Sequence, residues 1–163
     1  IEGRGTSGHW EADFMLFARY GQGLLVLHER QTRFSIVLHP LDRKAVLTAR
    51  TIARQLGKLP QALRKTISFD NGTEFAEHHR LHNALGVQTF FCDPHSPWQK
   101  GGVENSIGRL RRSLPRKTDL KAITAAALKR LAQRLNDTPR KCLDFKTPAE
   151  AFSKLKSIVA LQT

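Results

Sequence analysis

The sequence has few of the residues and segments that mark several large classes of protein. Its 163 residues include only two cysteines, Cys92 and Cys142, too few for a disulfide framework or a four-cysteine zinc site. No apolar run approaches the roughly 18 residues of a membrane-spanning helix, and no secretory leader pattern opens the chain. We therefore expect neither a disulfide-stabilised secreted domain nor a membrane protein, and we expect a cytoplasmic location.

Acidic residues are scarce beside basic ones. The chain has 14 Asp and Glu against 27 Lys and Arg, a formal net charge of +13 and an isoelectric point near 10.6. Residues 98–141 alone hold 12 basic and 3 acidic residues. This excess favours a polyanionic partner, nucleic acid before membrane. A solvated helix face is the alternative interpretation of the basic segment, and the neighbouring Glu104 favours a phosphate-binding surface.

The first residues do not look like part of a fold. Residues 1–4 spell Ile-Glu-Gly-Arg, which resembles an engineered protease site, and residues 5–7 resemble a cloning junction. We predict that residues 1–7 are a remnant of this kind and that residues 8–163 form one domain. The length and the 40% hydrophobic composition suit a single domain with a real core. On this interpretation the chain is a fragment of something longer.

Hydrophobic periodicity predicts an α/β domain. Short alternating or apolar runs predict strands over 9–17, 24–28, 34–39, 66–69 and 87–91. Helical spacing predicts helices over 45–59, 73–85, 104–114 and 120–135, and Thr-Pro-Ala-Glu at 147–150 begins another. Three strands in an antiparallel meander followed by two helix-linked strands predict a five-stranded mixed sheet flanked by helices, a layout similar to the ribonuclease H fold.

Three acidic residues occupy unusual positions. Asp13 interrupts an apolar strand, Asp70 ends a short strand, and Glu104 opens a helix in the most basic part of the chain. In the predicted fold the first and fourth strands are neighbours, which brings Asp13 beside Asp70, and the helix after the fifth strand delivers Glu104. Clustered carboxylates repel one another, and a hard divalent cation such as Mg²⁺ removes that cost. Two such cations can hold the attacking and leaving oxygens of a phosphoryl transfer.

Each of these acids has a simpler interpretation when taken alone. Asp13 could be edge-strand polarity, Asp70 could belong to the Asn71-Gly72 turn, and Glu104 could favour a helix N-terminus. The order of the three in the predicted fold and the basic flank favour the metal site. On the 104–114 helix, Glu104 and Arg111 share a face, so Arg111 is placed to approach a bound phosphate.

Ordered motifs carry a family resemblance across residues 8–153. They are GHWEAD (8–13), TRF (32–34), FDNGTEF (69–75), DPHSPWQKG (93–101), EN (104–105) and LRR (110–112). The set resembles the catalytic core of bacterial transposases of the insertion-sequence-30 family, and more broadly the DDE transposases and retroviral integrases. Asp70 and Glu104 are separated by 33 residues, the spacing that this family uses.

The resemblance implies a function and a set of site residues. Asp13, Asp70 and Glu104 would be the catalytic triad and the ligands of Mg²⁺ or Mn²⁺, two ions in all. The activity would be cleavage of a DNA strand at the end of an insertion sequence and transfer of that strand to target DNA. The protein would act as a dimer or higher multimer, and the N-terminal helix-turn-helix region of the family is absent here. The implied DNA-binding residues are Asn71, Trp98, Lys100, Arg109, Arg111 and Arg112.

Two other functions stay open on the sequence. A ribonuclease H-like nuclease would cleave without joining strands, and a non-catalytic DNA-binding or assembly module would keep the fold without the reaction. Glu11 shares the strand face of Asp13 and could be a fourth carboxylate, although a spacing of roughly 7 Å along the strand favours a supporting role. His95 could touch DNA or shape its loop.

Overall fold

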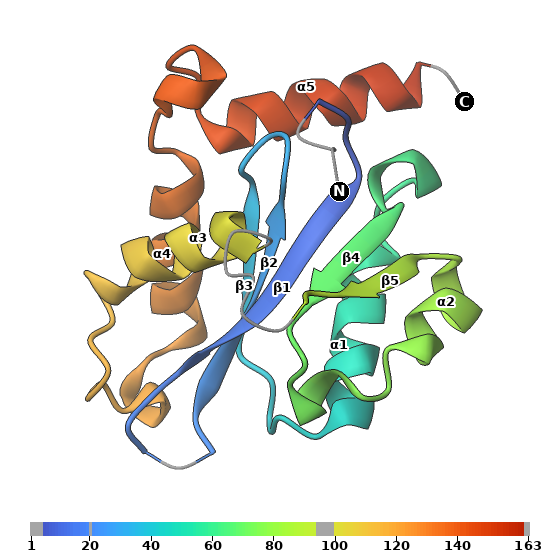
Figure 1. Cartoon of the computed structure of the whole chain (residues 1–163). Coiled ribbons are helices and arrows are strands. Elements are labelled where there is room, and N and C mark those ends of the chain that lie inside the picture. Colours follow the sequence, from blue (N-terminus) through green and yellow to red (C-terminus); the bar gives the residue numbers. More distant parts are fainter. Residues whose placement is uncertain (1–4, 20, 94–99, 162–163) are drawn as a thin grey trace.

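A mixed five-stranded β-sheet runs through the computed structural model, which describes residues 5–19, 21–93 and 100–161 (Figure 1). The strand order is β3-β2-β1-β4-β5, with β1–β2 and β2–β3 antiparallel and β1–β4 and β4–β5 parallel. This arrangement confirms the predicted fold class. The strands are β1 (His9–Leu16), β2 (Gly23–Glu29), β3 (Ser35–Leu38), β4 (Thr66–Phe69) and β5 (Gln88–Phe91).

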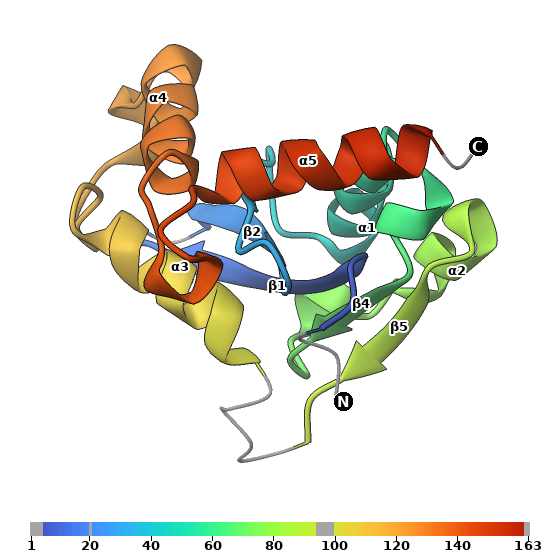
Figure 2. The same ribbon diagram turned by 90° about the horizontal axis from the view of Figure 1, so that it is seen from above.

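Alternation along β1 divides the core into two layers. Trp10, Ala12 and Phe14 pack on one face, whereas Met15 packs on the other, because successive side chains of a strand point to opposite faces. The first layer holds α1 (Ala45–Leu56), α2 (His79–Leu85) and α5 (Pro148–Ala160), and the second holds α3 (Gly101–Arg111) and α4 (Ala125–Asn136). Figure 2 shows α3 and α4 on one side of the molecule, α1 and α2 on the other, and α5 spanning the two.

Helix α5 is fixed by its start and by an aromatic contact. The Thr147 hydroxyl accepts from the Glu150 N–H, and the Glu150 carboxylate accepts from the Thr147 N–H, which is the predicted capping box. One turn later, the Phe152 ring stacks on Phe34 at 4.4 Å and meets the edge of Trp10 at 5.9 Å. These contacts hold the last helix on the first-layer core.

Two predicted helices begin later than the periodicity indicates. Residues 73–85 start as a 3₁₀ turn (Thr73–Phe75), and α2 begins only at His79. The Phe75 ring turns inward and stacks on Phe69 at 4.6 Å, which the 3₁₀ turn permits. Residues 120–135 likewise start as a 3₁₀ turn (Leu120–Ala122), and α4 follows a new cap at Thr124. The single helices predicted over 73–85 and 120–135 are therefore wrong in their first turns.

Two further boundaries bear on function. Helix α1 ends at Leu56, three residues before the predicted end, and α3 begins at Gly101, three residues before Glu104.

Within the described part of the chain, no helix is both long and apolar enough to cross a membrane.

Candidate active site

Asp13 and Asp70 lie side by side on neighbouring parallel strands. Strands β1 and β4 pair in parallel with Glu11 opposite Ser68. The residue two places beyond each partner is Asp13, within β1, and Asp70, directly after β4, so the two come to lie beside each other. The ammonium of Lys100 contacts both carboxylates, with Nζ 3.0 Å from Asp13 Oδ2 and 3.1 Å from Asp70 Oδ2. The structure thus brings two of the predicted site acids together around one cation.

The backbone fixes the direction of both carboxylates. Asp13 Oδ1 accepts from the Phe14 N–H at 2.7 Å, and Asp70 Oδ1 accepts from the Gly72 N–H at 3.1 Å. With each Oδ1 held by a backbone amide, each Oδ2 is left to face the shared cation. A Cβ at Gly72 would lie 3.0 Å from Asp70 Oδ1, so this turn uses glycine for a close approach.

The electrostatics of this cluster are those of a cation-binding position. Burial raises the pKa of Asp13, and the nearby Asp70 charge raises it further, while Lys100 opposes both effects. Burial alone would lower the pKa of Lys100, but the two aspartates outweigh it and the pKa is raised. Two carboxylates therefore share one ammonium in a half-buried setting, where a positive charge between them is stabilising.

Glu104 lies in the first turn of α3 and is exposed. Across residues 5–19, 21–93 and 100–161, no three or more His, Cys, Asp or Glu side chains come close enough to hold a metal ion. The structure therefore does not bring Glu104 into the group formed by Asp13 and Asp70. The donor set of the pair nevertheless fits a hard divalent cation, because it consists of two carboxylates that already share a positive charge.

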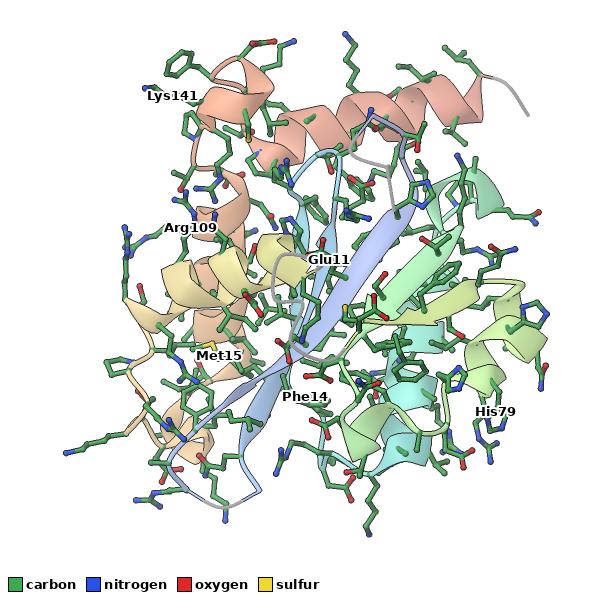
Figure 3. All side chains as sticks on the ribbon, in the orientation of Figure 1. Glu11, Phe14, Met15, His79, Arg109 and Lys141 are labelled. Carbon is green, nitrogen blue, oxygen red and sulfur yellow. The ribbon has the colours of Figure 1, made fainter. Side chains whose placement is uncertain are left out.

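Glu11 ties α3 to β1. Its side chain is buried between the strand and the start of the helix (Figure 3), where Oε2 accepts from the Val103 N–H at 2.8 Å. Its Oε1 lies 3.2 Å from Arg30 Nε. Burial raises the pKa of Glu11, whereas the Val103 hydrogen bond and the Arg30 charge lower it. Glu11 thus satisfies a backbone donor of the first helical turn from outside the helix.

Gly102 permits this close contact between helix and sheet. A Cβ at that position would lie 2.6 Å from His28 Cδ2 and 2.8 Å from Glu11 Oε2. The sequence placed Glu11 on the face of Asp13 and favoured a supporting role, but it did not identify Val103 as the partner. A glycine directly before Val103 carries no such signal by itself.

Arg111 is held by the protein. Its guanidinium lies 4.9 Å over the Phe17 ring and donates from Nη2 to the Leu16 carbonyl. Burial lowers the pKa of Arg111, and the charge of Arg116 lowers it further. Arg111 therefore joins α3 to the end of β1, and it lies on the same helical face as Glu104. Arg109 is exposed on α3, and Arg112 is exposed at the C-terminal end of that helix.

The other predicted DNA-binding residues divide between the site and the loop. Lys100 joins the two aspartates, as described, and Asn71 donates from Nδ2 to the Cys92 carbonyl at 3.2 Å, linking the ends of β4 and β5. Trp98 and His95 lie outside the described residues.

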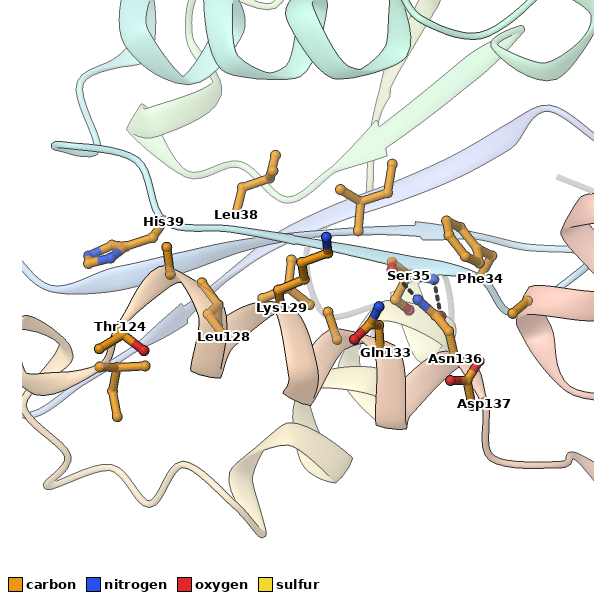
Figure 4. Close-up of a pocket in the computed structure, with 16 residues that line it drawn as sticks. Phe34, Ser35, Leu38, His39, Thr124, Leu128, Lys129, Gln133, Asn136 and Asp137 are labelled. Carbon is orange, nitrogen blue, oxygen red and sulfur yellow. Dashed lines mark hydrogen bonds between the residues drawn. The ribbon is translucent and has the colours of Figure 1, made fainter.

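A separate groove of about 740 Å³ runs between β3 and α4 (Figure 4). At its base Asn136 donates to the Ser35 carbonyl at 2.8 Å and accepts from the Ser35 N–H at 2.9 Å, so a side-chain amide pairs the backbone of this edge strand. Of the predicted site residues that the structure describes, none lines this groove.

Comparison with known proteins gives consistent results. Residues 4–97 match the family described as Integrase core domain. The chain is 36% identical over 154 residues to transposase InsI for insertion sequence element IS30C of Escherichia coli K12, covering 94% of this chain and 40% of that protein. It is 37% identical over 155 residues to the transposase for insertion sequence element IS1086 of Cupriavidus metallidurans, covering 95% and 46%. The chain therefore spans less than half the length of these relatives.

A solved structure extends the comparison to the fold. The catalytic core domain of BIV integrase superposes with a TM-score of 0.70 at 20% identity, covering 94% of this chain and 99% of that one. The likeness supports a ribonuclease H-like fold for the chain.

Proposed function

The chain belongs to the integrase core domain family, and on that premise we propose that it is the catalytic domain of a DNA transposase. The observation that carries the proposal is the pair of carboxylates from Asp13, within β1, and Asp70, directly after β4, which share one cation. The relatives named as insertion-sequence transposases support DNA as the substrate class. The reaction we assign is cleavage at an element end followed by transfer of the strand to target DNA.

Asp13, Asp70 and Glu104 are the residues that we assign to holding Mg²⁺ or Mn²⁺. When bound, such ions supply positive charge to the attacking and leaving oxygens of a phosphoryl transfer. The Oδ2 atoms of Asp13 and Asp70 are already directed to one point by backbone hydrogen bonds to their Oδ1 atoms. Glu104 enters the assignment because it follows Val103, the residue that Glu11 holds against the sheet.

Lys100 has two roles in this proposal. Its ammonium contacts Asp13 and Asp70 and offsets part of their negative charge. If these carboxylates held a divalent cation, Lys100 would be free to pair with a DNA phosphate and keep a positive charge near the reacting group.

Arg111 orients the same region from the far end of α3. Its contacts with Leu16 and Phe17 hold the C-terminal end of α3 against the end of β1. Arg109 and Arg112 are exposed and are assigned to the DNA backbone, where phosphate contacts set position without reading sequence. We also propose that the active assembly is a dimer or higher multimer acting on paired ends.

The test is strand transfer with a pre-cleaved DNA end that carries a free 3′ hydroxyl, a plasmid target, and Mg²⁺ or Mn²⁺. We expect joined product from the chain and its loss in Glu104→Gln. Glu77→Gln is the matched control, because Glu77 is a carboxylate just before α2 whose partners are Arg80 and His79. Hydrolysis without joining would identify a nuclease, and DNA binding without any metal-dependent chemistry would identify an assembly module.

A further inference from the structure

A small polar pocket lies on the flank of α3 away from the carboxylates. Its volume is about 270 Å³, and it is lined by residues from β2, the β2–β3 loop, α3 and the segment after α4. We call it the arginine pocket, after Arg33, Arg109 and Arg140, which line it together with His28, Asn105 and Cys142. Among the described residues, no acidic side chain lines it.

Three guanidinium groups line this pocket, and the nearby Glu11 carboxylate is within electrostatic reach of Arg33. Burial lowers the pKa of Arg140, and the charge of Arg109 lowers it further, which places the two groups within electrostatic reach of each other. Arg140 donates to the Leu135 carbonyl, a neutral partner that leaves its charge uncompensated. Like charges gathered in this way are destabilising unless an anion joins them. Arginine is also the side chain whose planar fork matches a phosphate.

His28 reports the same positive potential independently. Its imidazole is buried, and its pKa is lowered to about 3 by burial first and then by the charges of Arg33, Arg140 and Arg30. Its Nδ1 is within 3.0 Å of the hydroxyls of Ser35 and Ser106, while its Nε2 is buried and finds no hydrogen-bond partner in the part of the chain that the structure describes. A neutral imidazole with an unpartnered nitrogen therefore forms part of the wall of the pocket.

The backbone at Arg33 adds a further observation. Arg33 adopts a φ of 62°, in the left-handed region that favours glycine. An arginine at such a position costs stability in the folded chain, and strain of this kind collects at functional sites. The loop between β2 and β3 nevertheless places the Arg33 side chain at the pocket.

The pocket and Glu104 lie on opposite flanks of helix α3. At about 100° per residue, Asn105 and Arg109 fall on one flank, and Glu104 and Arg111 fall on the other. A DNA strand that crosses the first turns of α3 therefore meets Glu104 on one side and the arginine pocket on the other.

We propose that the arginine pocket binds a phosphodiester group of the DNA backbone, at a position separate from the carboxylate site. The inference rests on the proposed function, because it takes DNA as the substrate and adds a second point of attachment on α3. Arg109 and Arg33 contact the phosphate oxygens, and Arg140 supports them from the pocket wall. The contact fixes the path of the strand and reads no bases.

Cys142 supplies a built-in probe, since it lines the pocket and its thiol is exposed. The experiment uses the chain with Cys92→Ser, so that Cys142 is the one remaining thiol. The rate of Cys142 alkylation is measured with and without a DNA duplex, and DNA affinity is measured in parallel at several salt concentrations. Arg109→Gln and Arg33→Gly are the test variants. Glycine relieves the backbone at position 33, so that variant removes the charge without harming the fold.

Arg130→Gln is the matched control, because it removes the same charge from an exposed position on α4 that does not line the pocket. We expect DNA to slow Cys142 alkylation severalfold in the parent and in Arg130→Gln. In Arg109→Gln and Arg33→Gly, DNA should no longer protect Cys142 from alkylation. We also expect each test variant to lower the slope of log affinity against log salt by about 1.

The outcomes separate the two proposals. Retained DNA binding with Cys142 alkylated at the same rate in its presence overturns the phosphate contact and leaves the proposed function standing. Protection of Cys142 by inorganic phosphate alone, with DNA affinity unchanged in Arg109→Gln, assigns the pocket to a free anion and overturns the DNA contact. Absence of both DNA binding and strand transfer overturns the proposed function and this inference with it.

Discussion

The carboxylate of Glu11 accepts a hydrogen bond from the backbone N–H of Val103, 2.8 Å away, and this contact joins the strand of Asp13 to the helix of Glu104. Asp13 lies two residues beyond Glu11, and Glu104 directly follows Val103. The distance between the two proposed metal ligands therefore depends on a residue that is itself outside the ligand set.

Removal of the Glu11 carboxylate should destabilise the fold and misplace α3. Glu11→Ala leaves the Val103 N–H and the buried Arg30 guanidinium without their partner, a loss of about 2–4 kcal/mol in the free energy of unfolding. Urea denaturation measures the change, and strand transfer should fall with it. Glu77→Ala, which removes an exposed ion pair, is the control and should unfold close to the parent. Equal stability of the two variants would contradict the role assigned to Glu11.

Replacement of Lys100 should change the response of the protein to metal ions. In Lys100→Gln the Asp13 and Asp70 carboxylates face each other without a counter-charge, which should cost about 1–2 kcal/mol after allowance for their exposure. Mn²⁺ replaces the missing charge, so its addition should raise the unfolding temperature more in Lys100→Gln than in the parent.

Thermal unfolding with chelator and with Mn²⁺ measures this difference. Lys129→Gln is the control, since Lys129 is an exposed lysine of α4 away from the aspartates. If Mn²⁺ shifts the parent, Lys129→Gln and Lys100→Gln equally, Lys100 does not compete with metal ions at this site.

The sequence predicted the sheet and the adjacency of Asp13 and Asp70 for one physical reason. Strand-length apolar runs and their connections set the order of the strands, and that order makes β1 and β4 neighbours, which brings Asp13 beside Asp70. Helix starts were less predictable, because they depend on local caps that periodicity does not see. Thr124 restarts α4 after a 3₁₀ turn, although the apolar spacing runs on through Leu120 and Ile123.

The contacts of the site residues could not be predicted from the sequence. Lys100 appeared there as a residue for DNA, and no spacing rule indicates that its ammonium reaches two carboxylates 30 and 87 residues away. Arg111 was placed toward a phosphate by helical geometry, but its packing on Phe17 depends on where β1 ends. The arginine pocket combines residues from separate elements and had no motif to indicate it.

Arg111 and Arg112 should differ in what their removal costs. Arg111→Gln breaks the contacts with Phe17 and Leu16, so it should lower stability by about 1 kcal/mol as well as DNA affinity. Arg112→Gln removes the same charge from an exposed position and should lower DNA affinity alone. Urea denaturation and salt-dependent DNA binding of the two variants measure the difference. Unchanged stability in Arg111→Gln would show that its contacts with β1 contribute nothing.

The buried imidazole of His28 should make the fold sensitive to mild acid. Unfolded chains protonate it near its ordinary pKa of 6.5, whereas the folded protein holds that pKa at about 3. Between these values the unfolded state binds more protons, so the free energy of unfolding falls as the pH drops, by about 1.4 kcal/mol per pH unit from this group. Well above pH 6.5 the imidazole of His28 is neutral in both the folded and the unfolded state, so its protonation no longer lowers the free energy of unfolding.

Comparison with His28→Asn isolates this contribution from the other titrating groups. Asparagine keeps a polar atom near the position of Nδ1, where His28 meets Ser35 and Ser106, but it cannot be protonated. Between pH 7 and pH 5 the parent should lose about 2 kcal/mol more stability than His28→Asn in urea denaturation. Parallel curves for the two proteins would mean that the folded imidazole is readily protonated. Burial and the charges of Arg33 and Arg140 would then not hold the pKa of His28 down.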